Sequence, residues 1–478
     1  MEKPRQHYNV TLAALTLAGT AFAFQQTMVV PALPVLQREL HTTTTWATWV
    51  LTVFLLVASV ATPILGKLGD QYGKERLLVI SLCFFLLGCV GCAFSWDIWS
   101  LIAFRALAGT GAAVFPLSFA IIRDEFPPEK VGVGIGLVSS VFGVGGGFGI
   151  VLSGVIVDNL SWRWLFIFGS IGIALAILLV MRFVPESPIK TPSRVDVPGA
   201  VLLSGGLIAF LLALTEGESW GWSSGRILGL LAVAAVLLVA WVMVELRVPE
   251  PMVDMRMMVR RTVLLTNITA LIAGFAMFSV FVLVPNFVEM PRGVPEQWER
   301  LVDYGFGASA TKAGLYLLPG SVVLLFAGPL AGMIGRRIGF KWPMSIGMAL
   351  IGVGAGMLAI WHDEPWQIVA SQPVFGIGIG FAFAAMATII AQTVRPSETG
   401  IAGGMNTVMR TVGGVIGGQV GAALLTANTI PGTPIPSVDG FEIAFALGAI
   451  AALVGAIVSI FIVTARQPER RELALEPG

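Results

Sequence analysis

The sequence predicts an all-α membrane protein of fourteen transmembrane helices, with two six-helix repeats and two further helices between them. Three observations predict this fold. Hydrophobic residues make up 56% of the 478 residues and charged residues only 12%, and the mean hydropathy is +0.86, far from the composition of a water-soluble domain. The apolar residues gather into fourteen segments, and a set of glycines recurs along the chain. Such spans leave only short connections, so we expect no separate domain outside the membrane.

Each apolar segment is long enough to cross a hydrocarbon core of about 30 Å as a helix, and far too long for a barrel strand. No small-residue cleavage pattern follows the first segment, so we expect it to remain as a membrane span. Cys83, Cys89 and Cys92 share one segment, where thiols pack as small hydrophobes. The expected spans are 10–31, 46–66, 77–95, 98–122, 131–156, 163–184, 198–216, 226–246, 262–288, 312–333, 342–361, 366–391, 401–426 and 441–464.

The distribution of Lys and Arg predicts the orientation of the spans. The two tails and the even-to-odd connections carry 21 of these residues, and the other connections carry 6. Because Lys and Arg are retained on the cytoplasmic side during insertion, we expect both termini in the cytoplasm and the protein in the plasma or inner membrane. The formal net charge of +1 favours neither nucleic acid nor an acidic partner.

Glycines predict an internal duplication. Those after span 2 return after span 10 at an offset of 266, those of span 4 return in span 12 at 267, and those of span 5 return in span 13 at 268. Because eight spans separate the two starts, both halves enter the membrane from the same side, as parallel repeats do. We therefore expect an N-terminal bundle at 1–184, a peripheral inserted pair at 198–246, a C-terminal bundle at 262–464 and a cytoplasmic tail at 465–478.

The connection after span 2 carries the most specific motif. It reads Gly-Lys-Leu-Gly-Asp-Gln-Tyr-Gly-Lys-Glu-Arg over 66–76 and resembles the signature of the major facilitator superfamily, within which the chain is most similar to the fourteen-span drug:proton antiporters. Glycines permit a tight turn and close helix approach, while Asp70 can sit at a helix N-terminus and pair with a basic residue across the two halves, which would latch the cytoplasmic side shut. The expected gating residues are Gly66, Gly69, Asp70, Gly73, Arg76, Gly335, Arg336 and Gly339.

Two arginines lie within spans. Arg105, in Arg-Ala-Leu-Ala-Gly-Thr-Gly, resembles the family's arginine–glycine motif in span 4, although Ala108 replaces the usual glutamine. Arg410 resembles the arginine that the family carries in span 13. An intramembrane arginine costs at least about 2.5 to 3.5 kcal/mol on insertion scales, so it should face a wet cavity or a polar partner. We expect both to line the central passage, and the alternative for each is a structural tie between helices.

Span 5 and the Ser-Trp-Arg-Trp run at 161–164 resemble the antiporter motif and its outer marker. The expected Gly-Pro-x-x-Gly-Gly reads Gly-Ile-Val-Leu-Ser-Gly over 149–154, so the proline is absent and one glycine is serine. Small residues still permit close helix packing. This motif is what distinguishes exporters from importers in the family, so without its proline the resemblance implies export less strongly.

The inventory of intramembrane charges bears on the substrate. Relatives that expel organic cations carry an acidic residue in span 1 where this chain has Gln25, and the sequence places no Asp or Glu near the middle of any span. With two arginines as the ionised groups there, electrostatics favours neutral or anionic amphipathic substrates over dications. The expected cavity residues are Gln25, Gln26, Arg105, Asn267, Gln372, Asn406 and Arg410. Candidate proton carriers lie nearer the span ends, at Asp70, Asp124, Glu245, Glu289 and Glu442.

The resemblance implies a secondary transporter that exports hydrophobic or amphipathic small molecules in exchange for protons, by alternating access. Proton-coupled uptake or export of a specific organic solute or anion is the alternative. A membrane enzyme is less favoured, because His7, His41 and His362 are scattered singly and no clustered metal site or nucleophile is formed. We expect a monomer in membrane lipid, with no cofactor, metal or nucleic acid.

Overall fold

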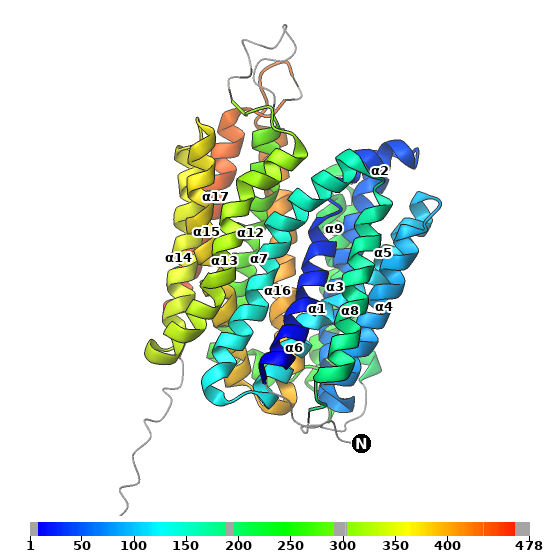
Figure 1. Ribbon diagram of the computed structural model, residues 1–478, viewed down its shortest axis with the longest axis vertical. Coiled ribbons are helices and arrows are strands. Elements are labelled where there is room, and N and C mark those ends of the chain that lie inside the picture. Colours follow the sequence, from blue (N-terminus) through cyan, green and yellow to red (C-terminus); the bar gives the residue numbers. More distant parts are fainter. Residues whose placement is uncertain (1–7, 188–195, 291–301, 303, 434, 464–478) are drawn as a thin grey trace, which may run out of the picture.

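The computed structural model describes residues 8–187, 196–290, 302, 304–433 and 435–463, which form helices joined by short turns (Figure 1). Within these residues, twelve helices are long and apolar enough to cross a membrane. Two more, α1 (Tyr8–Thr27) and α7 (Pro128–Asn159), have 20 and 32 residues and also reach across about 30 Å. The prediction of an all-α protein with fourteen spans is confirmed. The expected tail at 465–478 lies outside the described residues.

The N-terminal bundle has its six spans where hydropathy predicts them. Span 4 is divided, because residues Thr110–Ala113 form a tighter 3₁₀ turn, η1, between two α-helical pieces. A seven-residue helix, α2 (Leu33–Glu39), follows α1 and was not predicted. The remaining helices of this bundle are α3 (Thr44–Tyr72), α4 (Lys74–Ala93), α5 (Ile98–Gly109), α6 (Val114–Glu125) and α8 (Arg163–Phe183).

The C-terminal bundle repeats the arrangement with six further spans. A short helix, η2 (Pro396–Glu398), precedes its fifth span. The spans are α12 (Arg261–Glu289), α13 (Ala310–Ile338), α14 (Lys341–Ile360), α15 (Pro365–Thr393), α16 (Thr399–Ala427) and α17 (Val438–Ile460). The inserted pair consists of α9 (Val197–Trp220) and α10 (Gly225–Glu245).

Capping residues and glycines set the ends of the spans. The side chains of Thr43 and Ser309 accept hydrogen bonds from the first turns of α3 and α13, which satisfies N–H groups that have no partner within the helix. Gly73 and Gly339 end the same two helices with φ of 119° and 87°, values that favour glycine. The glycines that recur at an offset of 266 therefore close equivalent turns in the two halves.

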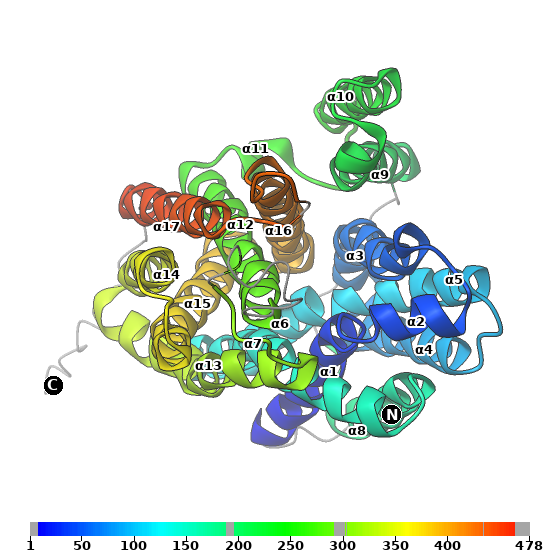
Figure 2. The same ribbon diagram turned by 90° about the horizontal axis from the view of Figure 1, so that it is seen from above.

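The two bundles lie side by side, each with its own hydrophobic core. Seen from above, α9 lies against α3 and α10 is farther out (Figure 2). Six large apolar side chains along α10 are exposed, as lipid-facing residues are: Leu228, Val233, Val236, Val239, Val242 and Met243. The inserted pair thus flanks the bundles beside α3.

The segment after α10 differs from its predicted form. The apolar pattern predicts an amphipathic helix on the membrane surface over 251–261, but the structure has only one helical turn there, α11 (Met255–Met258). Met252, Val253 and Met257 are buried against the bundles instead of facing lipid. The prediction of a surface helix was wrong because these apolar side chains pack inside the protein.

The two described chain ends lie at the same end of the molecule. The ring of Tyr8 packs on Phe126 at the end of α6, and Thr262 at the start of α12 donates a hydrogen bond to the carbonyl of Val463. We call this the lower end, as drawn in Figure 1, and the end that carries α2 the upper end.

Candidate transport cavity and its lower closure

A cavity lies between the two bundles at mid-height. The N-terminal bundle contributes side chains from α1, α3 and α6, and the C-terminal bundle contributes side chains from α12 and α16. The enclosed space is about 20 Å³, whereas pockets for small molecules enclose about 300 Å³ or more. A substrate can therefore enter only after the bundles separate. The lining residues are Phe22, Gln26, Leu55, Ala58, Thr62, Ala112, Phe115, Met277, Phe278, Thr407, Arg410 and Thr411.

Two of the predicted cavity residues meet here from opposite bundles. Gln26 comes from α1, and Arg410 comes from α16. Arg410 is 7% exposed and its guanidinium carbon lies 4.6 Å from the centre of the Phe383 ring, a cation–π contact that stabilises a desolvated charge. The cavity therefore combines apolar and aromatic walls with hydroxyl groups, one amide and one positive charge.

Arg105 and Gln25 lie away from this cavity, inside the N-terminal bundle. Arg105 is 0% exposed and donates hydrogen bonds to the backbone carbonyls of Gln25 in α1 and Val50 in α3, both at 3.2 Å. The Gln25 side-chain amide donates to the carbonyl of Leu165 in α8 at 2.9 Å. These contacts correspond to the helix-tie alternative for Arg105.

The three other predicted cavity residues lie inside the C-terminal bundle. Asn406 donates a hydrogen bond to the side-chain oxygen of Asn267 at 2.9 Å, which joins α16 to α12. Gln372 is buried on α15, where its amide contacts the Ser371 hydroxyl at 3.1 Å. None of these three is among the residues that line the cavity.

Asp70 joins the bundles at the lower end, through backbone N–H groups and not through the basic residue that the sequence analysis expects across the two halves. Its two carboxylate oxygens accept hydrogen bonds from the backbone N–H groups of Gly400 and Ile401, at 3.3 and 3.2 Å. These N–H groups belong to the first turn of α16, where the helix dipole favours a negative charge. Lys74 lies 3.9 Å from Asp70 and also pairs with Asp124. Asp70 thus bridges the bundles, and the positive charge of Lys74 offsets the repulsion between the carboxylates of Asp70 and Asp124.

The glycines around Asp70 allow the backbones to touch. A Cβ atom built on Gly66 would lie 2.5 Å from the carbonyl oxygen of Gly400, and one built on Gly69 would lie 2.3 Å from a Leu117 methyl carbon. The contact at Gly66 excludes any side chain because it is with backbone, whereas at Gly69 the Leu117 side chain would have to shift. Close approach of α3 and α16 therefore requires glycine at 66 and 400.

Arg123 is a bridging residue that the sequence analysis did not single out. Its guanidinium donates to the carbonyls of Val394 (2.7 Å) and Arg395 (3.3 Å) and to the hydroxyl of Thr399. All three acceptors belong to the C-terminal bundle. Arg123 follows a span directly, so nothing in its sequence context separates it from the other Lys and Arg residues at span ends.

The C-terminal copy of the motif keeps the turn and the close backbone contact, since a Cβ on Gly332 would lie 2.5 Å from the carbonyl oxygen of Gly132 in α7, but it lacks the acid. Arg336 stands where the 266-residue offset would place an acid equivalent to Asp70, and it is exposed. Gly335 packs on the Phe340 ring, and Gly339 ends α13. In the first copy, Arg76 is also exposed, and its backbone N–H donates to Glu186 at 3.4 Å.

Known proteins resemble this chain along most of its length. The family model described as Major Facilitator Superfamily matches residues 15–301 and 299–478. "Multidrug resistance protein 3" of Bacillus subtilis is 30% identical over 77% of this chain and 70% of its own. The "Tetracenomycin C resistance and export protein" of Streptomyces glaucescens is 26% identical over 87% of this chain and 76% of its own.

Two solved structures share the fold. The human organic anion transporter MFSD10 superposes with a TM-score of 0.65 at 12% identity, and covers 95% of this chain and all of its own. The proton:xylose symporter XylE gives a TM-score of 0.62 at 15% identity, with 95% of both chains covered.

Proposed function

Because the chain belongs to the Major Facilitator Superfamily, whose members are secondary transporters of small molecules, we propose that it exports neutral or anionic amphipathic compounds in exchange for protons. Transport proceeds by alternating access, with the cavity between the bundles open to one side of the membrane at a time. The lower end faces the cytoplasm, in agreement with the excess of Lys and Arg in the connections at that end. The chain is a transporter and not an enzyme.

The composition of the cavity carries this proposal. Of its twelve lining residues, Arg410 is the one that ionises, and the list contains no carboxylate. In a site of low dielectric a fixed positive charge attracts an anionic group and repels a cation. The aromatic and aliphatic walls supply the apolar contact that hydrophobic compounds need. These features together favour compounds with an apolar body and a neutral or negative polar group.

The relatives support the direction of transport. Three relatives that each cover three quarters or more of this chain are named as a multidrug resistance protein, a resistance and export protein and a multidrug transporter. The exchange of substrate for protons is inferred from the family.

Accumulation assays in whole cells test the proposal. Cells that express the chain should retain less of a neutral and of an anionic amphipathic dye than cells without it, and an uncoupler should abolish the difference. Arg410→Ala should reduce export of the anionic dye by about tenfold or more, because a charge-assisted hydrogen bond contributes about 1.5 to 3 kcal/mol. Arg182→Ala, which removes an exposed arginine outside the cavity, is the control.

Three outcomes would contradict the proposal. Strong export of a dicationic dye without export of the other two would show that the charge of the cavity does not select the substrate. Higher dye retention in expressing cells would indicate uptake, the alternative considered above. Export that persists in the presence of an uncoupler would separate transport from the proton gradient.

A further inference from the structure

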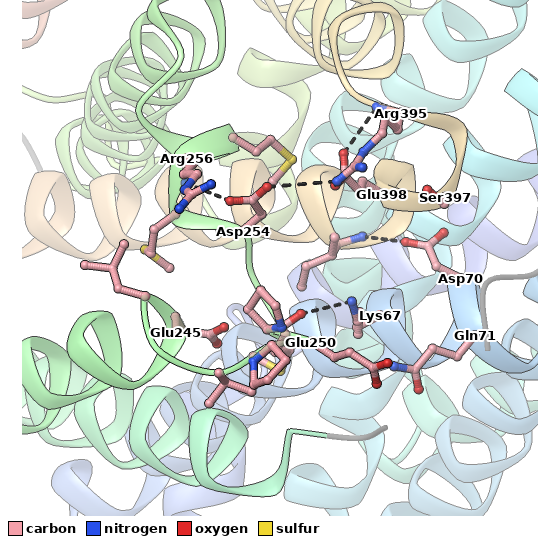
Figure 3. Close-up of a pocket in the computed structure, with 18 residues that line it drawn as sticks. Lys67, Asp70, Gln71, Glu245, Glu250, Asp254, Arg256, Arg395, Ser397 and Glu398 are labelled. Atoms are coloured by element: carbon pink, nitrogen blue, oxygen red, sulfur yellow. Dashed lines mark hydrogen bonds and ion pairs between the residues drawn. The ribbon is translucent and has the colours of Figure 1, made fainter. Parts of the chain in front are cut away.

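The segment that leaves the inserted pair crosses the lower end of the molecule. We call residues 246–258, between α10 and the start of α12, the exit strap. Figure 3 shows this strap on one side of a pocket of about 420 Å³, with residues of α3 and of the η2–α16 junction on the other. The pocket is therefore enclosed by the inserted pair, the N-terminal bundle and the C-terminal bundle together.

Lys67 attaches the strap to the N-terminal bundle. It lies on α3, three residues before Asp70, and its ammonium group donates a hydrogen bond to the backbone carbonyl of Pro251 at 3.1 Å (Figure 3). A carbonyl that accepts from a charged donor makes a stronger contact than a neutral pair. This contact joins the strap to the helix that carries the principal bridging acid.

Glu245 holds the strap against the inserted pair. Its carboxylate is 3% exposed and accepts two hydrogen bonds, from the indole N–H of Trp241 at 2.8 Å and from the backbone N–H of Val253 at 3.0 Å. The first contact fixes the carboxylate on α10, and the second turns the strap back toward α3. Pro251, which receives Lys67, lies only two residues before Val253.

The strap also packs against the C-terminal bundle. Val253 and Met257 are fully buried in one apolar cluster with Ile401 and Met405 of α16. Asp254 lies 3.9 Å from the guanidinium of Arg395, beside η2. The cluster also includes Leu56 of α3. One short segment therefore contacts both bundles at the level where Asp70 bridges them.

The upper part of the inserted pair is attached to α3 as well. The indole N–H of Trp49 in α3 donates to the buried carboxylate of Glu216 in α9 at 2.8 Å. The pair is thus anchored to α3 at its upper end through Glu216 and at its lower end through the strap. When α3 moves relative to α16, the pair must move with α3 while the strap remains attached to α12.

We propose that the exit strap is a further contact of the lower gate, and that Glu245 is the positioning residue that keeps it there. Separation of the lower ends of α3 and α16 releases the strap from Lys67, so the strap favours the state that is closed at the lower end. The inserted pair thereby biases the transport cycle, beyond filling the link between the bundles. This inference rests on the alternating access of the proposed function, but not on the substrate or the coupling ion.

Distance measurements between spin labels test the proposal without any substrate. Tyr72 and Ile338 end α3 and α13, are both 52% exposed, and are equivalent by the 266-residue offset. Labels at Tyr72→Cys and Ile338→Cys, with the three native cysteines replaced by Ala, report the separation of the lower ends in lipid nanodiscs. Glu245→Gln keeps one acceptor oxygen and places an amide N–H₂ against one of the two N–H donors, and Lys67→Met removes the donor to Pro251. Each should raise the ratio of long to short distances by about twofold to twelvefold, as expected for a lost hydrogen bond of about 0.5 to 1.5 kcal/mol.

Matched controls separate this effect from general destabilisation. Lys67→Arg retains a charged donor and should keep the wild-type distances. Glu129→Gln and Lys130→Met make the same chemical changes at two exposed residues of the lower end and should also leave the distances unchanged. If Lys67→Met shows the same distances as Lys67→Arg, the proposal is overturned, whether or not Glu245→Gln folds. Because no dye is transported in this measurement, a failed export assay with shifted distances would contradict only the substrate assignment.

Discussion

At the scale of single residues, the two intramembrane arginines show what the sequence could and could not predict. The cost of a buried charge correctly predicts that Arg105 and Arg410 need polar or aromatic surroundings. The sequence alone does not predict whether each arginine side chain points into its own bundle or into the cavity, because that depends on the packing of neighbouring helices. In the structure Arg105 donates to carbonyls of its own bundle, and Arg410 faces the cavity between bundles.

Arg105 should therefore act on stability. Arg105→Met removes both hydrogen bonds to α1 and α3 and leaves two carbonyls without their donor in the bundle interior, so we expect a lower midpoint of thermal unfolding in detergent. Hydrogen bonds between membrane helices contribute about 0.6 kcal/mol each on average, so the expected loss is about 1 kcal/mol or more. A fluorescence-detected thermal scan checks this, with Arg410→Met as the comparison. An equal loss in both variants would contradict the distinction.

Arg123 should act on the lower closure. It donates to three acceptors of the C-terminal bundle from one guanidinium, and hydrogen bonds from charged groups contribute about 1.5 to 3 kcal/mol. Arg123→Ala should therefore raise the population open at the lower end by about tenfold or more, measured by labelling Ile401→Cys with a membrane-impermeant thiol reagent from that side. Arg182→Ala, which removes an exposed arginine at the same end, should not change the labelling rate.

At the scale of helices, the glycine spacing predicted the repeat and its closing turns, and the structure adds the contacts between copies. Hydropathy located all fourteen spans because each is long and apolar throughout. It missed α2 and overextended the helix at 251–261. A helix of seven residues is shorter than any hydropathy window, and the strap is buried by contacts from distant parts of the chain.

The contact between α3 and α16 gives a test at this scale. A Cβ on Gly400 would lie 2.5 Å from the carbonyl oxygen of Gly66, and two backbones can relieve such a clash only by moving apart. Gly400→Ala should therefore hold the lower end open and abolish transport, while the protein still reaches the membrane. Gly418→Ala lies on the same helix with no atom within 4 Å of its Cβ and should transport normally. Normal transport by Gly400→Ala would show that this closure is not needed.

At the scale of the whole molecule, the predicted all-α membrane fold is confirmed, and it is that of the major facilitator superfamily. The bridging acid was predictable because its motif is specific. Most of the cavity was not, since Phe22, Leu55, Phe115 and Met277 are ordinary apolar residues until two bundles meet. Three of the predicted polar residues, Gln25, Asn267 and Asn406, instead join helices within one bundle, and Gln372 contacts its neighbour Ser371 on α15.

The orientation in the membrane can be tested on intact cells. An epitope inserted into the 291–301 connection should be accessible from outside, whereas one at the N-terminus should become accessible only after permeabilisation. The reason is the excess of Lys and Arg in the connections on the N-terminal side. Antibody binding to each epitope on intact and on permeabilised cells, measured by flow cytometry, tests this orientation. Surface staining of the N-terminal epitope on intact cells would reverse the assignment.

The contacts that close the lower end and those that line the cavity come from almost separate sets of atoms. Closure depends on main-chain groups of Gly66, Gly400 and Ile401 with two charged side chains, Asp70 and Arg123, while the cavity wall is made of side chains in mid-span. A point mutation in that wall can alter which molecules are accepted and leave the moving parts intact. Exposure of cells to a new toxic compound can therefore select single substitutions that change the range of exported compounds.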